Sequence, residues 1–163
     1  MKKNHGFTLI EVLISMVILA IGLLGLAGIQ MMGLKNNLSS YQRGQATLLV
    51  YDMADRMRTN ITHAELGSNS QYVMTNPLTQ ATKQNGCTTI TGSCTPSQMA
   101  EHDLFEWNTD ITRILPNGVG KIEIFGPLAN RSFTISLTWD DKSKINDAYK
   151  TNDELEFKMS FKL

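Results

Sequence analysis

The sequence has no surplus of basic charge. Its 163 residues include 15 lysines and arginines and 15 aspartates and glutamates, so the formal net charge is zero. Proteins that bind nucleic acid neutralise phosphates with clustered basic side chains, so the composition gives no support for such a partner. Bulk disorder is also unsupported, because 42% of the residues are hydrophobic and only 18% are charged.

Residue patterns that carry chemistry are missing. The sequence contains no glycine-rich phosphate loop, His-Glu-x-x-His helix, Gly-x-Ser-x-Gly elbow or Cys-x-x-Cys pair. There are three histidines: His5 lies at the N-terminal end, and His63 and His102 are expected at the surface. We therefore expect no metal and no cofactor, and an enzymatic function has no set of residues on which to rest.

Cysteine is scarce, with Cys87 and Cys94 separated by six residues. Zinc sites normally need about four ligands with tight pairwise spacing, which this pair alone does not supply. In an exported protein a local disulfide is the simpler interpretation, and a metal site is the alternative. The loop-closure model gives a disulfide over so short a loop about 2–3 kcal/mol of stability.

Charge is also missing from a long stretch near the N-terminus. No charged residue lies between Val12 and Leu34, whereas residues 1–6 contain two lysines. About 20 apolar residues in a helix span a bilayer, and the preceding lysines favour a cytoplasmic N-terminus. A secretory signal peptide is the alternative, but the stretch is longer than a usual h-region and lacks a clear small-residue cleavage site at its far end.

One acid, Glu11, lies within this apolar region. A lone carboxylate in hydrocarbon is costly unless it is partnered or protonated, so it is a candidate functional residue. The run Gly6-Phe7-Thr8-Leu9-Ile10-Glu11-Val12 resembles the class III signal sequence of type IV pilins and type II secretion pseudopilins. The resemblance implies that a prepilin peptidase cuts between Gly6 and Phe7 and methylates Phe7 as the new N-terminal residue.

A free amine on Phe7 gives Glu11 a partner. Two opposite charges attract strongly in a low-dielectric filament core, and each is costly alone. Glu11 of an incoming subunit can therefore neutralise the Phe7 amine of its neighbour and fix the axial register between them. A contact between the two groups within one chain, one helical turn apart, is the competing explanation.

The helix is expected to continue beyond the apolar stretch. From Leu38 to Ile61, including Tyr41, apolar residues recur at helical spacing, and polar residues including Gln42 lie opposite. Four charged residues on this helix are expected to face solvent: Asp52, Asp55, Arg56 and Arg58. A contact between subunits is the alternative for them. The chain then divides into three parts. They are a leader peptide (1–6), a transmembrane or filament-core half of the helix (7–34) and a periplasmic globular domain (35–163).

Four parts are predicted within the globular domain. They are a helix (35–61), a loop that carries the disulfide (62–98), a second helix (99–115) and a sheet (119–163). The loop is rich in residues that favour turns. At its end, Thr95, Pro96 and Gln98 have the pattern of a capping box with proline in the first helical turn, which marks a helix start.

Three segments near the C-terminus alternate apolar and polar residues, over 119–125, 133–139 and 155–163. This period of two is typical of strands with one buried face, and local connections favour an antiparallel meander. Trp107 and Trp139 are expected in the core. The expected fold class is α+β, with a long N-terminal helix packed on about three antiparallel strands. This matches the type IV pilin fold.

Several short motifs resemble those of PilV-type minor pilins within the type IV pilin family: Cys94-Thr95-Pro96, Asp103-Leu104-x-x-Trp107, Leu115-Pro116-x-Gly118-x-Gly120 and Thr138-Trp139-Asp140. Unlike those of major pilins, the cysteines precede the sheet. The resemblance implies a structural subunit of a priming or tip complex that promotes pilus assembly. Its implied partners are other minor pilins, the major pilin, the prepilin peptidase and the inner-membrane assembly platform. It also implies a single pass through the inner membrane before transfer into the pilus.

Two alternatives stay open. A pseudopilin of a type II secretion system would have the same fold and processing in a different machine. A signal-anchored periplasmic enzyme or binding module belongs to another class, and it predicts that replacing Glu11 by valine has no effect.

Overall fold

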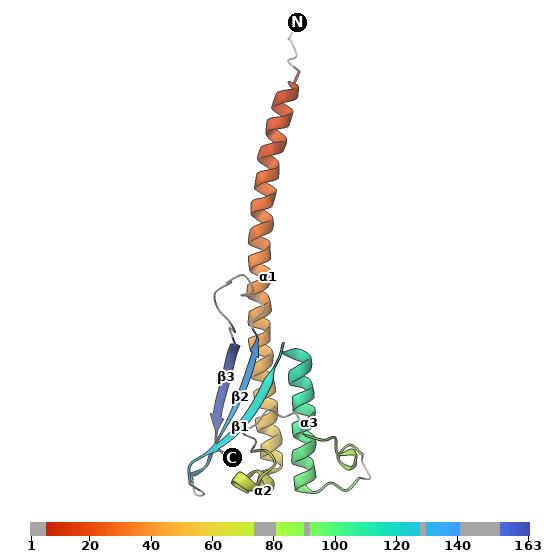
Figure 1. Ribbon diagram of the computed structural model, residues 1–163, viewed down its shortest axis with the longest axis vertical. Coiled ribbons are helices and arrows are strands. Elements are labelled where there is room, and N and C mark those ends of the chain that lie inside the picture. The colour runs from red at the N-terminus through yellow and green to blue at the C-terminus, as the bar shows by residue number, and fades with distance from the viewer. Residues whose placement is uncertain (1–5, 74–80, 90–91, 128–129, 141–153) are drawn as a thin grey trace. The chain divides into compact units, whose positions relative to one another are not determined.

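The computed structural model describes residues 6–73, 81–89, 92–127, 130–140 and 154–163. Within these residues the chain forms three α-helices and three strands, with short 3-10 helices in between. Figure 1 labels the α-helices and strands. In chain order the elements are α1 (Leu9–Thr59), α2 (Ile61–Ala64), η1 (Gly67–Asn69), η2 (Asn85–Cys87), α3 (Pro96–Ile114), β1 (Val119–Phe125), β2 (Ser132–Asp140) and β3 (Glu154–Phe161). The chain divides into two compact units, Met1–Leu38 and Ser39–Leu163.

The first unit consists of the N-terminal part of α1 and the residues before it. Every residue from Gly6 to Leu34 is exposed. Among the described residues, α1 is long and apolar enough to cross a membrane, by its length and composition. A helix that is apolar on all sides is stable only when lipid or other protein surrounds it. This part of α1 therefore needs an apolar environment that the described residues do not supply.

In the second unit, one face of α1 is buried in the core, from Gln42 to Met57. The predicted stripe is wrong at its ends. Tyr41 lies nine residues before Val50, which is two and a half helical turns, so it falls on the opposite, exposed face. Gln42 lies four residues before the buried Ala46 and is itself only 5% exposed, although it was predicted on the polar face.

The three strands form one antiparallel sheet in the order β1-β2-β3. β1 pairs with β2 from Val119↔Thr138 to Phe125↔Ser132, and β2 pairs with β3 from Phe133↔Phe161 to Asp140↔Glu154. The inward residues of β2 are almost completely buried: Phe133, Ile135, Leu137 and Trp139. This confirms the predicted meander and the α+β fold class.

The second helix, α3, begins at Pro96, three residues earlier than the predicted 99. Thr95 and Gln98 form the predicted capping box, in which the Thr95 side chain accepts a hydrogen bond from the Gln98 backbone N–H. In Figure 1, α3 lies beside β1 at one edge of the sheet. Segment 62–98 is less irregular than predicted, because its described part contains α2, η1, η2 and the first turn of α3.

Trp107 connects α3 to the rest of the core, as predicted. Its Nε1–H donates a hydrogen bond of 2.8 Å to the carbonyl oxygen of Leu49 in α1. Its ring lies against Gly120 of β1, where an added Cβ atom would be only 2.6 Å from the ring. The absence of a side chain at Gly120 therefore allows α3 and β1 to pack this closely.

Candidate assembly site

The predicted processing site precedes the first helix. Gly6, Phe7 and Thr8 are outside helix, and α1 begins at Leu9. Phe7 is 84% exposed, and no heavy atom of the described residues lies within 4 Å of a Cβ placed on Gly6. The peptide bond between Gly6 and Phe7 is therefore sterically open. The rest of the predicted leader, residues 1–5, lies outside the described residues.

Glu11 lies in the first turn of α1 and is exposed. Its backbone N–H donates a 3.1 Å hydrogen bond to the carbonyl oxygen of Thr8, which closes that turn. A negative charge in the first turn interacts favourably with the helix dipole. In the uncut chain the nitrogen of Phe7 belongs to an amide, and only cleavage would make it an amine. Pairing of Glu11 with a free Phe7 amine, within a chain or between chains, remains a prediction.

Cys87 and Cys94 are joined by a disulfide, with their Cα atoms 5.0 Å apart. This confirms the predicted bond, and it leaves neither cysteine as a thiolate ligand for a metal. Cys87 ends η2, and Cys94 directly precedes Thr95, the N-cap of α3. The disulfide therefore ties η2 to the beginning of α3.

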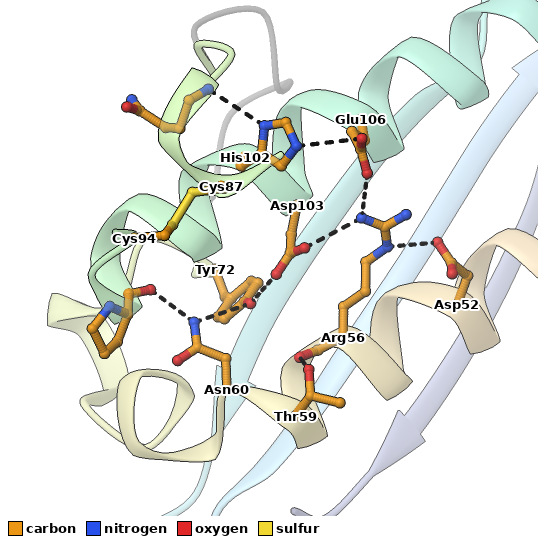
Figure 2. Close-up of polar contacts among 12 residues, drawn as sticks. Asp52, Arg56, Thr59, Asn60, Tyr72, Cys87, Cys94, His102, Asp103 and Glu106 are labelled. Atoms are coloured by element: carbon orange, nitrogen blue, oxygen red, sulfur yellow. Dashed lines mark hydrogen bonds and ion pairs between the residues drawn. A yellow bond between two sulfur atoms is a disulfide. The ribbon is translucent and has the colours of Figure 1, made fainter. Parts of the chain in front are cut away.

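A polar cluster joins the end of α1 to α3. Figure 2 shows its members: Asp52, Arg56, Asn60, Tyr72, His102, Asp103 and Glu106. The Arg56 guanidinium is 2.7 Å from a Glu106 oxygen, 3.2 Å from an Asp103 oxygen and 2.9 Å from an Asp52 oxygen. One cation thus holds three carboxylates, two of which belong to α3. The arrangement fixes α3 against α1.

The rest of the polar cluster satisfies the buried carboxylate of Asp103. The Tyr72 hydroxyl donates a hydrogen bond to Asp103. Asn60 donates to the Tyr72 hydroxyl over 3.3 Å and to the carbonyl oxygen of Pro96 over 2.7 Å. A buried acid without such partners would be strongly unfavourable. The polar cluster therefore holds together three segments that are far apart in the sequence.

The ionisable groups of the polar cluster influence one another. Burial tends to lower the pKa of Arg56, but the hydrogen bond to Glu106 and the charge of Asp52 outweigh it and raise that pKa above its ordinary value. The hydrogen bond from Arg56 lowers the pKa of Glu106. Burial, with the hydrogen bond to Asp103, raises the pKa of Tyr72. Arg56 and Glu106 are thus held as an ion pair and Tyr72 as a neutral phenol.

Two predictions fail in this region. His63 and His102 were expected at the surface, but both are buried. Their rings are accommodated because they have polar partners: Gln71 for His63, and Glu106 and Gln84 for His102. The spacing of His102 and Glu106, four residues apart on one helix, was the available signal.

Arg56 was also predicted on a solvated helix face, together with Asp52, Asp55 and Arg58. Asp55 and Arg58 do form an exposed pair. Arg56 instead reaches α3, where its side chain is only 26% exposed.

The phenol of Tyr72 is expected to make the folded state sensitive to alkali. A tyrosine in an unfolded chain ionises near pH 10, whereas burial and Asp103 raise the pKa of Tyr72 in the folded chain. The stabilisation is therefore complete below the unfolded pKa and is lost as the pH rises above it. The free energy of unfolding, from urea titrations at about pH 8 and about pH 10.5, is expected to fall between the two.

The variant Tyr72→Phe should be less stable at both pH values, because Asp103 loses a donor, but its loss between them should be smaller. Tyr41→Phe, at an exposed tyrosine, is the matched control and should keep the alkaline loss of the wild type. An equal alkaline loss in Tyr72→Phe would contradict this account.

Three features indicate a prepilin-type structural subunit. They are the apolar first part of α1, the exposed site of predicted processing and the second part of α1, which is buried on one face in the core. Comparison with protein families agrees. The prokaryotic N-terminal methylation motif matches residues 1–27, and the family described as type IV pilin Tt1218 matches residues 28–105. These two matches support a type IV pilin, a family that is structural and not enzymatic. No curated protein and no solved structure matches the chain.

The two matches have direct consequences. A pilin with the methylation motif is processed by a prepilin peptidase and assembles with other pilins. The motif and the apolar part of α1 are those of a membrane-anchored subunit. The protein is therefore a pilin or pseudopilin, whose work is assembly.

Proposed function

We propose that this protein is a minor pilin of the type IV pilus, of the PilV type, which acts in a priming or tip complex. The observation that carries the proposal is the methylation motif at the head of a fully exposed apolar helix segment. The position of the Cys87–Cys94 disulfide before the sheet favours a minor over a major pilin. The motif suits a subunit that joins a filament, and the disulfide position suits one that does not form its bulk.

In this proposal, the prepilin peptidase cuts between Gly6 and Phe7 and methylates Phe7. Residues 7–34 hold the subunit in the inner membrane, with residues 35–163 in the periplasm, and then transfer into the pilus. Glu11 pairs with the N-terminal amine of a neighbouring subunit. Other minor pilins, the major pilin and the inner-membrane assembly platform are the remaining partners.

An exposed stripe on the second part of α1 supports contact with other pilins. We call Tyr41, Gly44, Leu48 and Tyr51 the α1 stripe; the three large side chains are 52–62% exposed. Their spacing of three, four and three residues places them along one side of the helix. A Cβ on Gly44 would meet none of the described residues within 4 Å, so another helix can approach closely there.

Replacing Leu48 by glutamate is expected to reduce incorporation of the protein into pili by about tenfold, because assembly would bury a charge without a partner. The fold should be retained, since Leu48 is exposed. The measurement is the ratio of protein in sheared pili to protein in membranes. Thr109→Glu, an exposed position on α3, is the control and should assemble normally. Normal incorporation of Leu48→Glu would remove the α1 stripe as a contact surface.

The proposed function is tested by the intact mass and N-terminal sequence of the protein from membranes of its host. A chain that begins at Phe7 with one added methyl group supports it, whereas an intact Met1 contradicts it. Deletion of the gene for the protein then distinguishes a type IV pilus subunit from a type II secretion subunit. Loss of pili is the expected result, and loss of exoprotein secretion with normal pili would identify a type II pseudopilin instead.

A further inference from the structure

Both ring nitrogens of His102 have partners in the folded protein (Figure 2). Nδ1 lies 3.3 Å from the backbone nitrogen of Gln84, whose N–H donates to it. Nε2 lies 3.3 Å from a carboxylate oxygen of Glu106. A ring nitrogen that accepts a hydrogen bond cannot carry a proton. The two contacts together therefore require a neutral ring with its proton on Nε2.

The contact at Nδ1 holds Gln84 within a short segment, residues 81–89, which we call the docked segment. Gln84 directly precedes η2, and the Cys87–Cys94 disulfide ties η2 to the start of α3. The docked segment is also bound to Glu101 of α3: the Gln84 amide donates to its carboxylate over 2.7 Å, and the Thr82 hydroxyl donates to it as well. α3 thus holds the docked segment through one histidine and one carboxylate.

We propose that His102 is a pH-sensitive latch for the docked segment, engaged when the ring is neutral and released when Nδ1 takes a proton. A protonated Nδ1 points an N–H at the N–H of Gln84, and two donors cannot form a hydrogen bond. Histidine is the side chain that changes charge between pH 5 and 8. Mild acid therefore removes the backbone contact at Gln84, while the disulfide keeps the docked segment tethered to α3.

The charged groups around His102 allow this change. They lie on α3 itself, on α1 and on the docked segment: Glu101, Asp103, Glu106, Arg56 and Lys83. Glu106 stays an acceptor for Nε2–H in both states and attracts the protonated ring. Arg56 opposes protonation, but two carboxylates, Glu106 and Asp103, balance its charge. The ring can thus become charged and keep its partner at Nε2, so the bond that is lost is the one to Gln84.

The inference goes beyond the proposed function, because it applies equally to a pilus subunit and to a secretion pseudopilin. A released segment exposes the backbone of Gln84 and the surface of α3 beneath it. Contacts that other subunits make with this region would then depend on the pH outside the cell membrane.

The test is a pH titration of the full-length, ¹⁵N-labelled protein in detergent micelles, from about pH 7.5 to about pH 5.0, the range over which histidine titrates. At the upper pH, the Nδ1 resonance of His102 should be that of a hydrogen-bond acceptor. On acidification, the amide resonance of Gln84 should shift with the same midpoint as the His102 ring. Reduction of the disulfide by a phosphine should become about threefold faster, as expected for local opening.

His102→Asn separates the latch from a general effect of acid. The Asn side-chain oxygen can take the place of Nδ1 as acceptor for the Gln84 N–H, but it does not titrate. In this variant, the Gln84 resonance and the reduction rate should be independent of pH over the same range. His63→Asn, at the other buried histidine, should keep the full response of the wild type.

Two results would overturn the proposal. One is a wild-type titration in which the His102 ring takes up a proton while the Gln84 amide does not shift. The other is a pH response that persists unchanged in His102→Asn. The first needs no variant, so the proposal stays testable even where His102→Asn fails to fold.

Discussion

Replacing Glu11 by valine is expected to leave the protein in the membrane and to exclude it from pili. The change removes a carboxylate from the first turn of α1, which makes membrane insertion easier. It also leaves the amine of a neighbouring Phe7 without its counter-charge in a low-dielectric core, which costs about 3–5 kcal/mol. Incorporation into sheared pili, measured by immunoblot against the membrane fraction, should fall at least about tenfold.

The matched control for this prediction is Ser15→Val. Ser15 lies one helical turn beyond Glu11 and is also a polar residue in the apolar part of α1, with its hydroxyl bonded to the helix backbone. Loss of a hydroxyl removes no charge, so this variant should enter pili normally. Normal piliation of Glu11→Val would instead favour a pairing of Phe7 and Glu11 within one chain, or a signal-anchored protein outside any filament.

Replacing Trp107 by alanine should give the largest loss of stability of any single change considered. Large-to-small substitutions of a buried tryptophan cost about 3–5 kcal/mol. Trp107 is completely buried, contacts Gly120 and donates a hydrogen bond to Leu49, so α3 loses one contact with β1 and one with α1. The free energy of unfolding, measured by urea titration of the full-length protein in micelles, reports the loss.

Two tryptophan-to-phenylalanine variants separate packing from hydrogen bonding. Trp107→Phe loses the N–H donor to Leu49. Trp139 is also buried, but its Nε1 has no hydrogen-bond partner within the described part of the chain, so Trp139→Phe loses no bond there. Trp107→Phe is therefore expected to cost about 1 kcal/mol more than Trp139→Phe. Equal costs would show that the hydrogen bond to Leu49 contributes nothing measurable.

The parts of the fold that the sequence predicts are those set by local patterns. The alternation around Ile135 requires a strand with one buried face, and the Thr95–Gln98 capping box requires a helix start. The N-terminal limit of the buried face of α1 was harder to predict, because Tyr41 is apolar enough to fit a buried position. Only the helical phase relative to Val50 places it outside.

The polar cluster could not be predicted, because its partners are brought together by the fold. Arg56 is 47 residues from Asp103 and 50 from Glu106 in the sequence. No periodicity or short motif links positions so far apart. The burial of His102 has the same origin, since one of its partners is the backbone of Gln84.

The processing motif, in contrast to the polar cluster, can be found in the sequence but is not tested by the fold. Gly6, Phe7 and Glu11 are recognisable in the sequence because they lie within a short linear motif. The folded chain can show that the bond is exposed, but cleavage, methylation and pairing involve a second molecule. Those roles therefore rest on the motif and on the experiments above.

The close approach of Trp107 to Gly120 has a consequence for how this sequence can change over time. A methyl group at position 120 would overlap the indole ring, so neither position can change its size freely while the other stays fixed. Substitutions at 107 and 120 should therefore occur together among descendants of this protein, with a smaller residue at 107 wherever 120 gains a side chain. Positions 107 and 120 would therefore covary in an alignment of such descendants.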